Sequence, residues 1–255
     1  MKNTLTRIDN LKEETLNNEA WKRSVVSNDR TYHSYRGLPF YNERFDEVLS
    51  FHTPGLAPVR KNDKWFHINS HGKPIYGQRY DRAWGYYEGL ATVMKDGSYF
   101  HIDTNGKQVY AERYMWCGNF QYGLCTVQFK NSRYGHILTE GSRAYDETYL
   151  YAGDYQESYA VVQIDNGLHV HIDRNGKMLN EKGFLDLTPY HKGIASAKDS
   201  VGWFHINMNG EAIYDERYDS VEPFYNGHAR VITKYGEIKI INEKGNILLS
   251  IRGQL

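Results

Sequence analysis

Histidine is the residue type whose spacing in this chain first indicates chemistry. Six histidines recur at intervals of 34 or 35 residues, namely His33, His67, His101, His136, His171 and His205. Neutral imidazole is a common metal ligand, and it can also act as a general base near neutral pH. The spacing therefore allows two interpretations, a ring of metal ligands or a structural residue that every copy of a repeat retains.

The surroundings of these histidines favour the structural interpretation. Each stands in the same aromatic-rich context, as residues 65–69 and 203–207 show. Equivalent positions of a repeat lie a whole unit apart, so about three imidazoles at most could reach one ion, and only near a central axis. Buried polar side chains persist where they have hydrogen-bond partners. We therefore expect each imidazole to bond to a turn or to the tyrosine of its own repeat, and we predict no metal and no cofactor.

Four short strands can be placed in each period. The first contains the histidine, and the second follows a glycine-centred turn and ends in a tyrosine such as Tyr76 or Tyr110. The third opens with an aromatic residue such as Tyr80. The fourth follows a second glycine, such as Gly89, and has a small residue two positions later, as at Ala91. Strands of four or five residues and turns of about four fill the period.

This pattern predicts an all-β chain, a six-fold repeat of four short antiparallel strands. A six-bladed β-propeller is the favoured arrangement, because closure removes exposed sheet edges. An open β-solenoid is the alternative, since the half-unit at 235–251 could complete a shared blade or form a last rung. The repeat domain is expected over residues 28–255, with units near 28–61, 62–95, 96–130, 131–165, 166–199 and 200–234 before the half-unit.

Helical periodicity is confined to the N-terminal region. Apolar residues three to four positions apart, from Leu5 to Trp21, predict one short amphipathic helix over residues 4–22. Terminal repeats expose an end of the array that needs a cover. We therefore expect residues 1–27 to form a helical cap, with a helix that docks a partner as the alternative.

Composition narrows the classes of function. Lys+Arg and Asp+Glu are both 31, so the formal net charge is zero and no basic field attracts nucleic acid. We expect neither a signal peptide nor a membrane span, because no apolar run suits one. Two cysteines, Cys117 and Cys125, are too few to stabilise a secreted domain of 255 residues by disulfides, so we expect a reducing, cytoplasmic setting.

A guanidinium beside an aromatic ring also recurs, at residues 79–80 and 217–218. Such a pair could clamp a ligand. Arginine stacks on aromatic faces and pairs with carboxylates, so a structural role is favoured. We expect each of these arginines to bridge repeats, stacked on a tyrosine of the next unit or paired with its aspartate.

The second repeat carries a signature in three segments. They are Trp65-Phe66-His67-Ile68, Gly72-Lys73-Pro74-Ile75-Tyr76 and Gly89-Leu90-Ala91-Thr92-Val93. This pattern resembles the bacterial WG-repeat family over about residues 28–251, with no characterised member matched. The chain departs from the family where His and Phe replace the Trp-Gly pair. The resemblance implies a β-rich binding or scaffold module, often attached to other domains, and it supplies no catalytic motif.

Positions that differ between copies are the better guide to function, because a site for one asymmetric ligand should not repeat. The residue just before the second turn is polar-capable and changes from copy to copy. We therefore predict a polar, aromatic-rimmed pocket, walled by Trp84 and Trp116, if these loops converge on one face. The predicted ligand-binding residues are His52, Tyr87, Gln121, Asp154, Gln156, His191, Glu222 and Tyr225. The alternative is a solvated loop face with ordinary sequence drift.

Two hypotheses of function follow. The favoured one is a binding or scaffold module for a protein, a peptide or a small polar ligand, alone or beside a separate enzyme. The other is a propeller enzyme of the hydrolase, lyase or cyclase type, acting on a small polar substrate in a central pocket. The usual motifs of nucleophilic, phosphate, dinucleotide and zinc-protease sites are missing from the sequence. The hypothesis of a nucleophile formed by Cys117 or Cys125 with His191 has less support, because Cys125 fills the recurring small-residue position.

Overall fold

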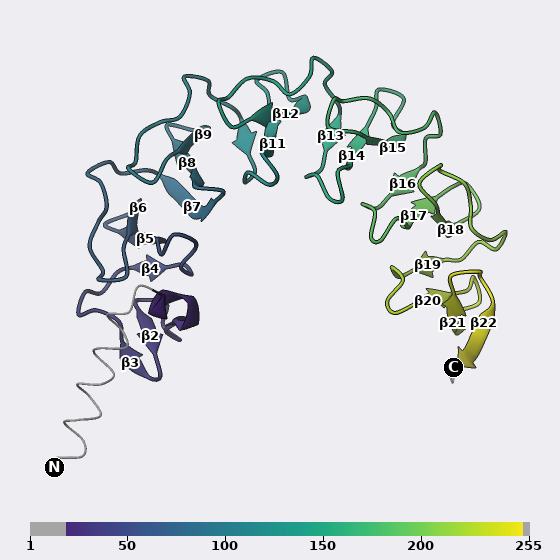
Figure 1. Ribbon diagram of the computed structural model, residues 1–255, viewed down its shortest axis with the longest axis horizontal. Coiled ribbons are helices and arrows are strands. Elements are labelled where there is room, and N and C mark those ends of the chain that lie inside the picture. The colour runs from purple at the N-terminus through teal and green to yellow at the C-terminus, as the bar shows by residue number, and fades with distance from the viewer. Residues whose placement is uncertain (1–18, 252–255) are drawn as a thin grey trace, which may run out of the picture. The chain divides into compact units, whose positions relative to one another are not determined.

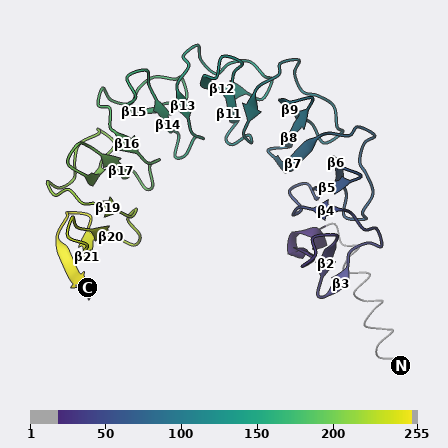
Figure 2. The same cartoon turned by 180° about the vertical axis from the view of Figure 1, so that it is seen from behind.

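The computed structural model describes residues 19–251, which form seven small sheets and one turn of 3-10 helix. The sheets follow one another in chain order, as Figure 1 shows from one side and Figure 2 from the other. Six sheets have three strands and the last has four. The chain is therefore all-β and repetitive, as the sequence predicts.

The strands contain two to six residues each. In the first three sheets they are β1 (Val25–Val26), β2 (His33–Tyr35) and β3 (Leu38–Pro39); β4 (Glu47–Val48), β5 (Ala57–Lys61) and β6 (Lys64–Ile68); β7 (Arg82–Tyr87), β8 (Leu90–Lys95) and β9 (Ser98–Ile102). In the next three they are β10 (Trp116–Cys117), β11 (Leu124–Gln128) and β12 (Tyr134–Leu138); β13 (Tyr151–Ala152), β14 (Ala160–Gln163) and β15 (His169–Ile172); β16 (Asp186–Leu187), β17 (Ala195–Lys198) and β18 (Trp203–Ile206). The last sheet contains β19 (Ser220–Val221), β20 (His228–Ile232), β21 (Ile238–Asn242) and β22 (Ile247–Ile251).

The chain divides into two compact units. The N-terminal unit runs to Lys130 and includes Thr139–Gly141, and the C-terminal unit comprises Asn131–Leu138 and the chain from Ser142 onward. The first three sheets belong to the N-terminal unit, and the last three belong to the C-terminal unit.

Each sheet after the first takes its strands from two successive sequence repeats, the half-unit included. In the third sheet, β7 and β8 belong to one repeat, and β9 carries His101 from the next. The remaining predicted segment, which ends in Tyr110, pairs with β9 only through a bridge between Ile102 and Gln108. The segment leaves the ladder there because its tyrosine turns back to bond with the histidine of β9.

The half-unit predicted at residues 235–251 completes the last sheet. β21 pairs with β20, and β22 pairs with β21, with an irregularity in register between Ile240 and Ile241. Ile240 stands 35 residues after His205, at the position that the histidine occupies in the preceding sheet. The terminal sheet is therefore built on the same plan without the imidazole.

Most of the helix predicted at residues 4–22 lies outside the described residues. Its described part contains a 3-10 turn at Ala20–Arg23, and Ala20 is buried. The Trp21 indole packs on Gly55, where an added Cβ would lie 2.9 Å from the indole Nε1. This turn therefore covers the loop between β4 and β5.

The small residue of each repeat lies in the central strand of a sheet, where the packing leaves no room for a larger side chain. Ala57 and Ala91 are fully buried, and Cys125 is 1 % exposed at the equivalent position. Buried valines follow two residues later, as at Val59 and Val93. Close packing around these side chains explains why the position stays small, because added methylenes in a filled core force its neighbours to shift.

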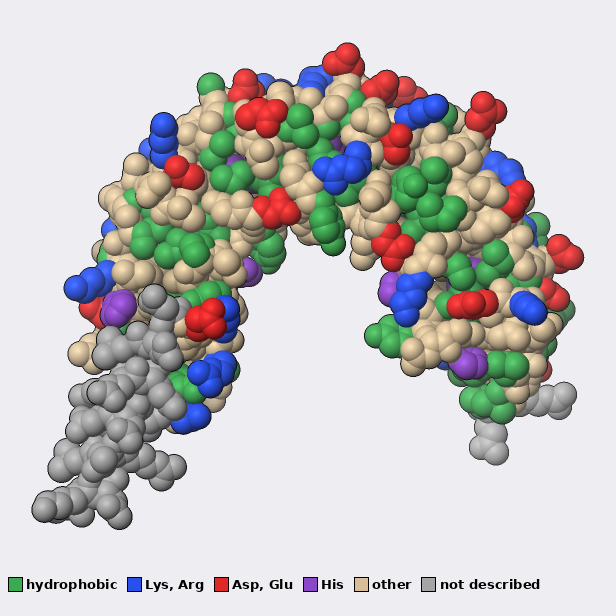
Figure 3. Space-filling model, in the orientation of Figure 1, with side chains coloured by type: hydrophobic (Ala, Val, Ile, Leu, Met, Phe, Trp, Pro, Cys, Tyr) green, Lys and Arg blue, Asp and Glu red, His purple; other side chains and the backbone are tan. Residues whose placement is uncertain are grey.

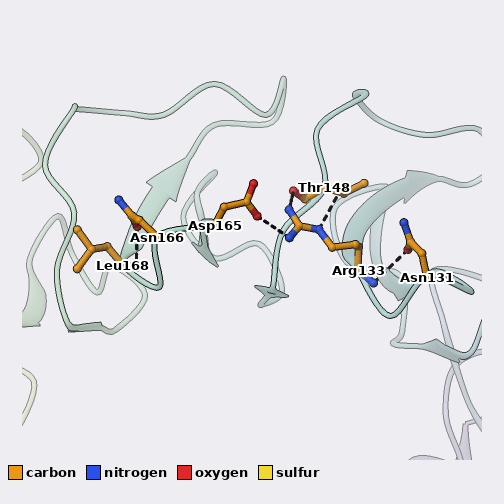
Figure 4. A network of polar contacts seen from close by, with 6 residues as sticks. All are labelled: Asn131, Arg133, Thr148, Asp165, Asn166 and Leu168. Carbon is orange, nitrogen blue, oxygen red and sulfur yellow. Dashed lines mark hydrogen bonds and ion pairs between the residues drawn. The ribbon is translucent and has the colours of Figure 1, made fainter.

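Polar contacts link neighbouring loops in the C-terminal unit (Figure 4). Arg133 donates from Nη2 to the carbonyl oxygen of Thr148 and from Nη1 to Asp165, each at 2.5 Å. Its own backbone N–H donates to the Asn131 side chain at 3.1 Å. The Asp165 carboxylate is 79 % exposed, so this ion pair is worth at most about 1 kcal/mol. The contacts fix the position of the loop more than they stabilise the fold.

Surface charge is mixed in sign. On the face shown in Figure 3, acidic and basic side chains are interspersed, with no large patch of either. Within residues 19–251, no helix has the length and apolar character needed to cross a membrane.

Candidate functional site

Each recurring histidine is buried and bonded to a carbonyl oxygen further along the chain. Their exposed fractions lie between 0 and 3 %. The six Nε2 atoms lie 2.7–3.1 Å from the carbonyl oxygens of Leu49, Trp84, Gly118, Gly153, Thr188 and Glu222. Because a carbonyl oxygen only accepts, Nε2 carries the hydrogen, and Nδ1 is left as an acceptor.

A tyrosine of the same repeat satisfies this acceptor. Tyr41 donates its hydroxyl to Nδ1 of His33 at 2.6 Å. Tyr214 donates to His205 at 2.5 Å. The same bond joins Tyr76 to His67, Tyr110 to His101 and Tyr145 to His136. The expectation of a structural imidazole, bonded to the tyrosine of its own repeat, is confirmed for these five histidines.

His171 is the exception, because Asn180 stands where the other repeats have tyrosine. Its ring stacks on Tyr190, with centroids 4.0 Å apart and planes inclined by 25°. Its Nε2 keeps the bond to Thr188. The fifth repeat therefore holds its histidine by stacking and by one hydrogen bond.

Burial lowers the pKa of all six imidazoles from 6.5 to about 4. Loss of solvent around the charged ring is the main cause, and the carbonyl acceptors, which favour the protonated ring, oppose it. The rings are therefore neutral at physiological pH. Rings bonded at both nitrogens have no position left for a metal or a substrate proton.

A second aromatic column packs against these histidines. Its members are Phe51, Tyr86, Phe120, Tyr155, Tyr190 and Phe224, whose ring centroids lie 4.0–4.6 Å from those of the imidazoles. Tyr86 also donates its hydroxyl to the carbonyl oxygen of Asp103, in the next repeat, at 3.0 Å. Each ring directly precedes a predicted site residue, so the column anchors that residue. These rings recur every 34 or 35 residues in the sequence, a period that could have identified the column.

Successive repeats meet where a tyrosine ring lies on a glycine. The Tyr145 ring covers Gly176 of the next repeat, and a Cβ built there would lie 2.6 Å from the ring. Gly176 also has a φ of +78°, a conformation that side chains other than glycine rarely adopt. The same tyrosine bonds to His136, so the imidazole, the phenol and the glycine connect two repeats.

The recurring arginines contact aromatic rings of their own repeats. Arg217 lies over Phe204 at 3.6 Å from the ring centroid, and its Nε donates to Asp199 at 2.7 Å. Arg79 lies over Phe66 at 3.9 Å. The predicted stacking on a tyrosine of the next repeat was therefore wrong. The partners are Phe66 and Phe204, which directly precede the histidines of these two repeats, because the arginine segment folds back across the histidine strand.

The variable positions precede tight hairpin turns. Tyr87, Gln121, Gln156, His191 and Tyr225 each pair across a two-residue turn with the first residue of the next strand segment. Both turn residues have positive φ in every case, as at Glu88 (49°) and Gly89 (79°). These values define the type I′ turn, which matches the twist of a hairpin. His52 precedes a three-residue loop in the equivalent place. We call these six turns with their preceding residues the hairpin tips.

Within each compact unit, the rings of one histidine and one tyrosine from neighbouring tips lie against each other. The His52 and Tyr87 rings lie 4.9 Å apart, with planes inclined by 52°. The His191 and Tyr225 rings lie 6.3 Å apart and nearly parallel, at 11°. Gly85 lies beneath the His52 ring, which a Cβ there would overlap. Predicted site residues from successive repeats thus meet in two pairs.

Glutamates tie other neighbouring tips together. The Glu88 carboxylate accepts from the backbone N–H groups of Tyr122 at 2.5 Å and Gly123 at 2.8 Å. In the C-terminal unit, Glu157 accepts from Lys192 at 2.6 Å and from Gly193 at 3.1 Å. The paired N–H groups of a tip turn therefore form a seat for a carboxylate. This contact was not predicted, because it joins residues that lie 34 to 36 positions apart in the sequence.

Two other predicted site residues lie outside the turns. Asp154 is exposed and directly precedes the buried Tyr155. The Glu222 carboxylate accepts from Arg230 at 2.8 Å, and its backbone carbonyl holds His205. Glu222 is therefore tied to the neighbouring strand.

A pocket of about 350 Å³ lies elsewhere in the N-terminal unit. It is lined by Gln78, Tyr80, Lys95, Phe100, Asn105, Gly106, Lys107, Gln108 and Arg113, and none of the predicted site residues is among them. Arg113 is stacked on Phe100 at 3.7 Å and bonded to Gln108 at 2.6 Å. One of the three cations that line the pocket is therefore already engaged within its own repeat.

Both cysteines are buried, free thiols. Burial raises the pKa of the Cys117 thiol far above its usual range. The Cys125 sulfur lies 3.7 Å from Nε2 of His101, inside the core. A thiol that stays protonated is a poor nucleophile, so Cys117 is poorly suited to covalent catalysis, and Cys125 is enclosed in the core.

Solved structures resemble this chain at low sequence identity. The computationally designed Ika8 protein matches with a TM-score of 0.50 and 12 % identity, over 91 % of this chain and 84 % of its own. BamB from Moraxella catarrhalis matches with a TM-score of 0.47 and 15 % identity, over 86 % and 79 %. The WD40 β-propeller domain of Doa1 matches with a TM-score of 0.35 and 15 % identity, over 81 % and 79 %. The likeness to Ika8 concerns the fold alone, and closure of the sheets into a ring remains a prediction.

A family model matches parts of the sequence. No curated protein matches the chain. The model of the WG containing repeat matches four segments, at residues 44–65, 68–99, 102–134 and 203–234. These segments contain four of the six hairpin tips and, of the recurring histidines, His205 alone, and they therefore identify WG repeats in those parts of the chain.

Proposed function

We propose that this chain is a binding scaffold that presents its hairpin tips to a protein or a peptide. The observation that carries the proposal is a constant backbone with changing side chains. Five tips share one turn geometry, while the residue before the turn is histidine, tyrosine or glutamine. A backbone fixed before binding reduces the entropy lost on association. Such an array offers different contacts at regular intervals.

The exposure of aromatic rings at the tips supports a macromolecular partner. Tyr122 is 67 % exposed and Tyr225 is 75 % exposed. Aromatic side chains are enriched where proteins bind one another. The enzyme hypothesis has no comparable support within residues 19–251, because the recurring histidines are committed to hydrogen bonds. We further propose a reducing, cytoplasmic setting, to which the free thiols of Cys117 and Cys125 are suited.

A tip variant tests the proposal. Replacing His52, Gln156 and His191 together by alanine should leave folding intact, because these residues lie at the surface or its edge. The tagged chain and its variant would be used to capture partners from cells that make the protein, with mass spectrometry as the readout. We expect the variant to lose partners that the unmodified chain captures.

A matched variant supplies the control. Lys130, Glu181 and Glu243 are also exposed but lie outside the tips, and alanine there should leave capture unchanged. Equal capture by the tip variant and by the control would overturn the assignment of the tips as the binding surface.

A further inference from the structure

The tip turns differ in whether their N–H groups are occupied. The turns at residues 122–123 and 192–193 each hold a glutamate carboxylate from the preceding tip. Across residues 19–251, the backbone N–H groups of Asn226 and Gly227 find no acceptor. Asn226 and Gly227 have φ values of 48° and 78°, within a few degrees of those at Lys192 and Gly193. An equivalent seat therefore exists at this turn without its carboxylate.

The sequence explains why this seat is open. The first turn residue of the preceding tip would supply the carboxylate, as Glu157 does one repeat earlier. At that position the chain has Lys192, which is exposed. Lys192 thus puts a cation at the sequence position from which a glutamate of the preceding repeat reaches the N–H donors of the next turn. Positive charge and two convergent N–H groups together favour a carboxylate from outside the chain.

The N-terminal unit repeats this combination in part. The N–H groups of Glu88 and Gly89 find no acceptor within the described residues either, and the preceding loop has Thr53 and Pro54 in place of a glutamate. Each of these two open turns follows a tyrosine whose ring packs against a histidine of the preceding tip. Only the C-terminal seat has the additional lysine.

We propose that the Asn226–Gly227 turn and the Lys192 ammonium bind an aspartate or glutamate side chain of an acidic peptide segment in a partner protein. The inference rests on the proposed scaffold function and names the chemistry of its partner. The exposed Tyr225 ring beside the seat offers apolar surface to residues that flank the carboxylate. A peptide suits such an open surface, since small ligands are usually held in enclosed pockets.

The first test observes the seat directly. The full chain, labelled with 15N, would be titrated with a synthetic peptide in which glutamate alternates with glycine. The matched peptide has glutamine in place of every glutamate. We expect the amide protons of Asn226 and Gly227 to shift downfield with the glutamate peptide and to stay in place with the glutamine peptide. Equal responses to both peptides would overturn the proposal.

Two charge reversals test the mechanism. Lys192→Glu should fill the seat internally, as Glu88 and Glu157 fill theirs, and should weaken peptide binding about tenfold or more. Its thermal unfolding temperature should not fall, which separates occupation of the seat from loss of fold. Glu157→Lys should empty the seat at residues 192–193 and add a second pair of amides that respond to the peptide. Unchanged binding by Lys192→Glu would contradict the inference.

The two proposals fail in different ways. If tip variants abolish partner capture but the glutamate peptide binds no better than its glutamine control, the scaffold function stands and the acidic partner is excluded. If the peptide shifts Asn226 and Gly227 but tip variants capture every partner, the seat is real and the tips are not the main binding surface.

Discussion

Gly176 shows how one absent Cβ fixes the contact between two repeats. The imidazole of His136 holds the Tyr145 hydroxyl, and the Tyr145 ring then occupies the space above Gly176. Replacement of any member affects the next repeat as well as its own. The histidine period is therefore maintained by packing between neighbours, which agrees with a structural role for the imidazole.

Alanine substitutions at two glycines separate this packing from backbone strain. Gly176 and Gly167 have φ values of +78° and +83°, so alanine costs roughly 1 kcal/mol at either position. Only at Gly176 would the new methyl group meet a ring, at 2.6 Å from Tyr145, which should add about 1–3 kcal/mol. We expect Gly176→Ala to unfold at a lower urea concentration than Gly167→Ala, measured by tryptophan fluorescence. Equal midpoints for the two variants would rule out the packing explanation.

The hairpin is the element whose sequence signals were most informative. The second glycine and the small residue after it predict a tight turn and a close-packed strand, and both are present, as at Gly89 and Ala91. The tyrosine segments were harder to predict, because one bond from Tyr110 to His101 ends their pairing after a single bridge. Contacts between residues that lie a whole repeat apart, such as the one that the Glu88 carboxylate makes, leave no local pattern in the sequence that could predict them.

Among the five two-residue turns, glycine occupies the second position in all but one, where the chain has Ser158. A substitution at Ser158 therefore tests the turn geometry. Its φ of 72° lies in the left-handed region, where a side chain is unfavourable. Ser158→Gly should therefore raise the free energy of unfolding by about 0.5–1 kcal/mol, after the entropy cost of glycine. Urea unfolding would measure the change.

The reciprocal substitution is the control. Gly193→Ser should destabilise the chain, because Gly193 has a φ of +76° and its added Cβ would make only ordinary contact with Met208, at 3.8 Å. A neutral or destabilising effect of Ser158→Gly would show that the serine contributes an interaction that outweighs its backbone strain.

At the scale of the whole molecule, the six recurring histidines act as one titrating set. All six are buried and neutral, and they occupy six of the seven sheets. The chain carries no net charge, so changes in long-range repulsion near neutral pH are small. Protonation of the buried rings is therefore the main expected source of pH dependence just below neutrality.

Stability should accordingly fall as the pH drops from 6.5 to about 4. The folded imidazoles have a pKa of about 4 and the unfolded ones about 6.5, so the unfolded chain binds more protons within this window. Each histidine can contribute a slope of up to about 1.4 kcal/mol per pH unit, and above 6.5 both states are neutral and the slope vanishes. Urea midpoints measured across the window would record this slope, and His171→Leu should reduce it by about a sixth. A midpoint independent of pH between 6.5 and 5 would mean that protons reach the buried rings without unfolding the chain.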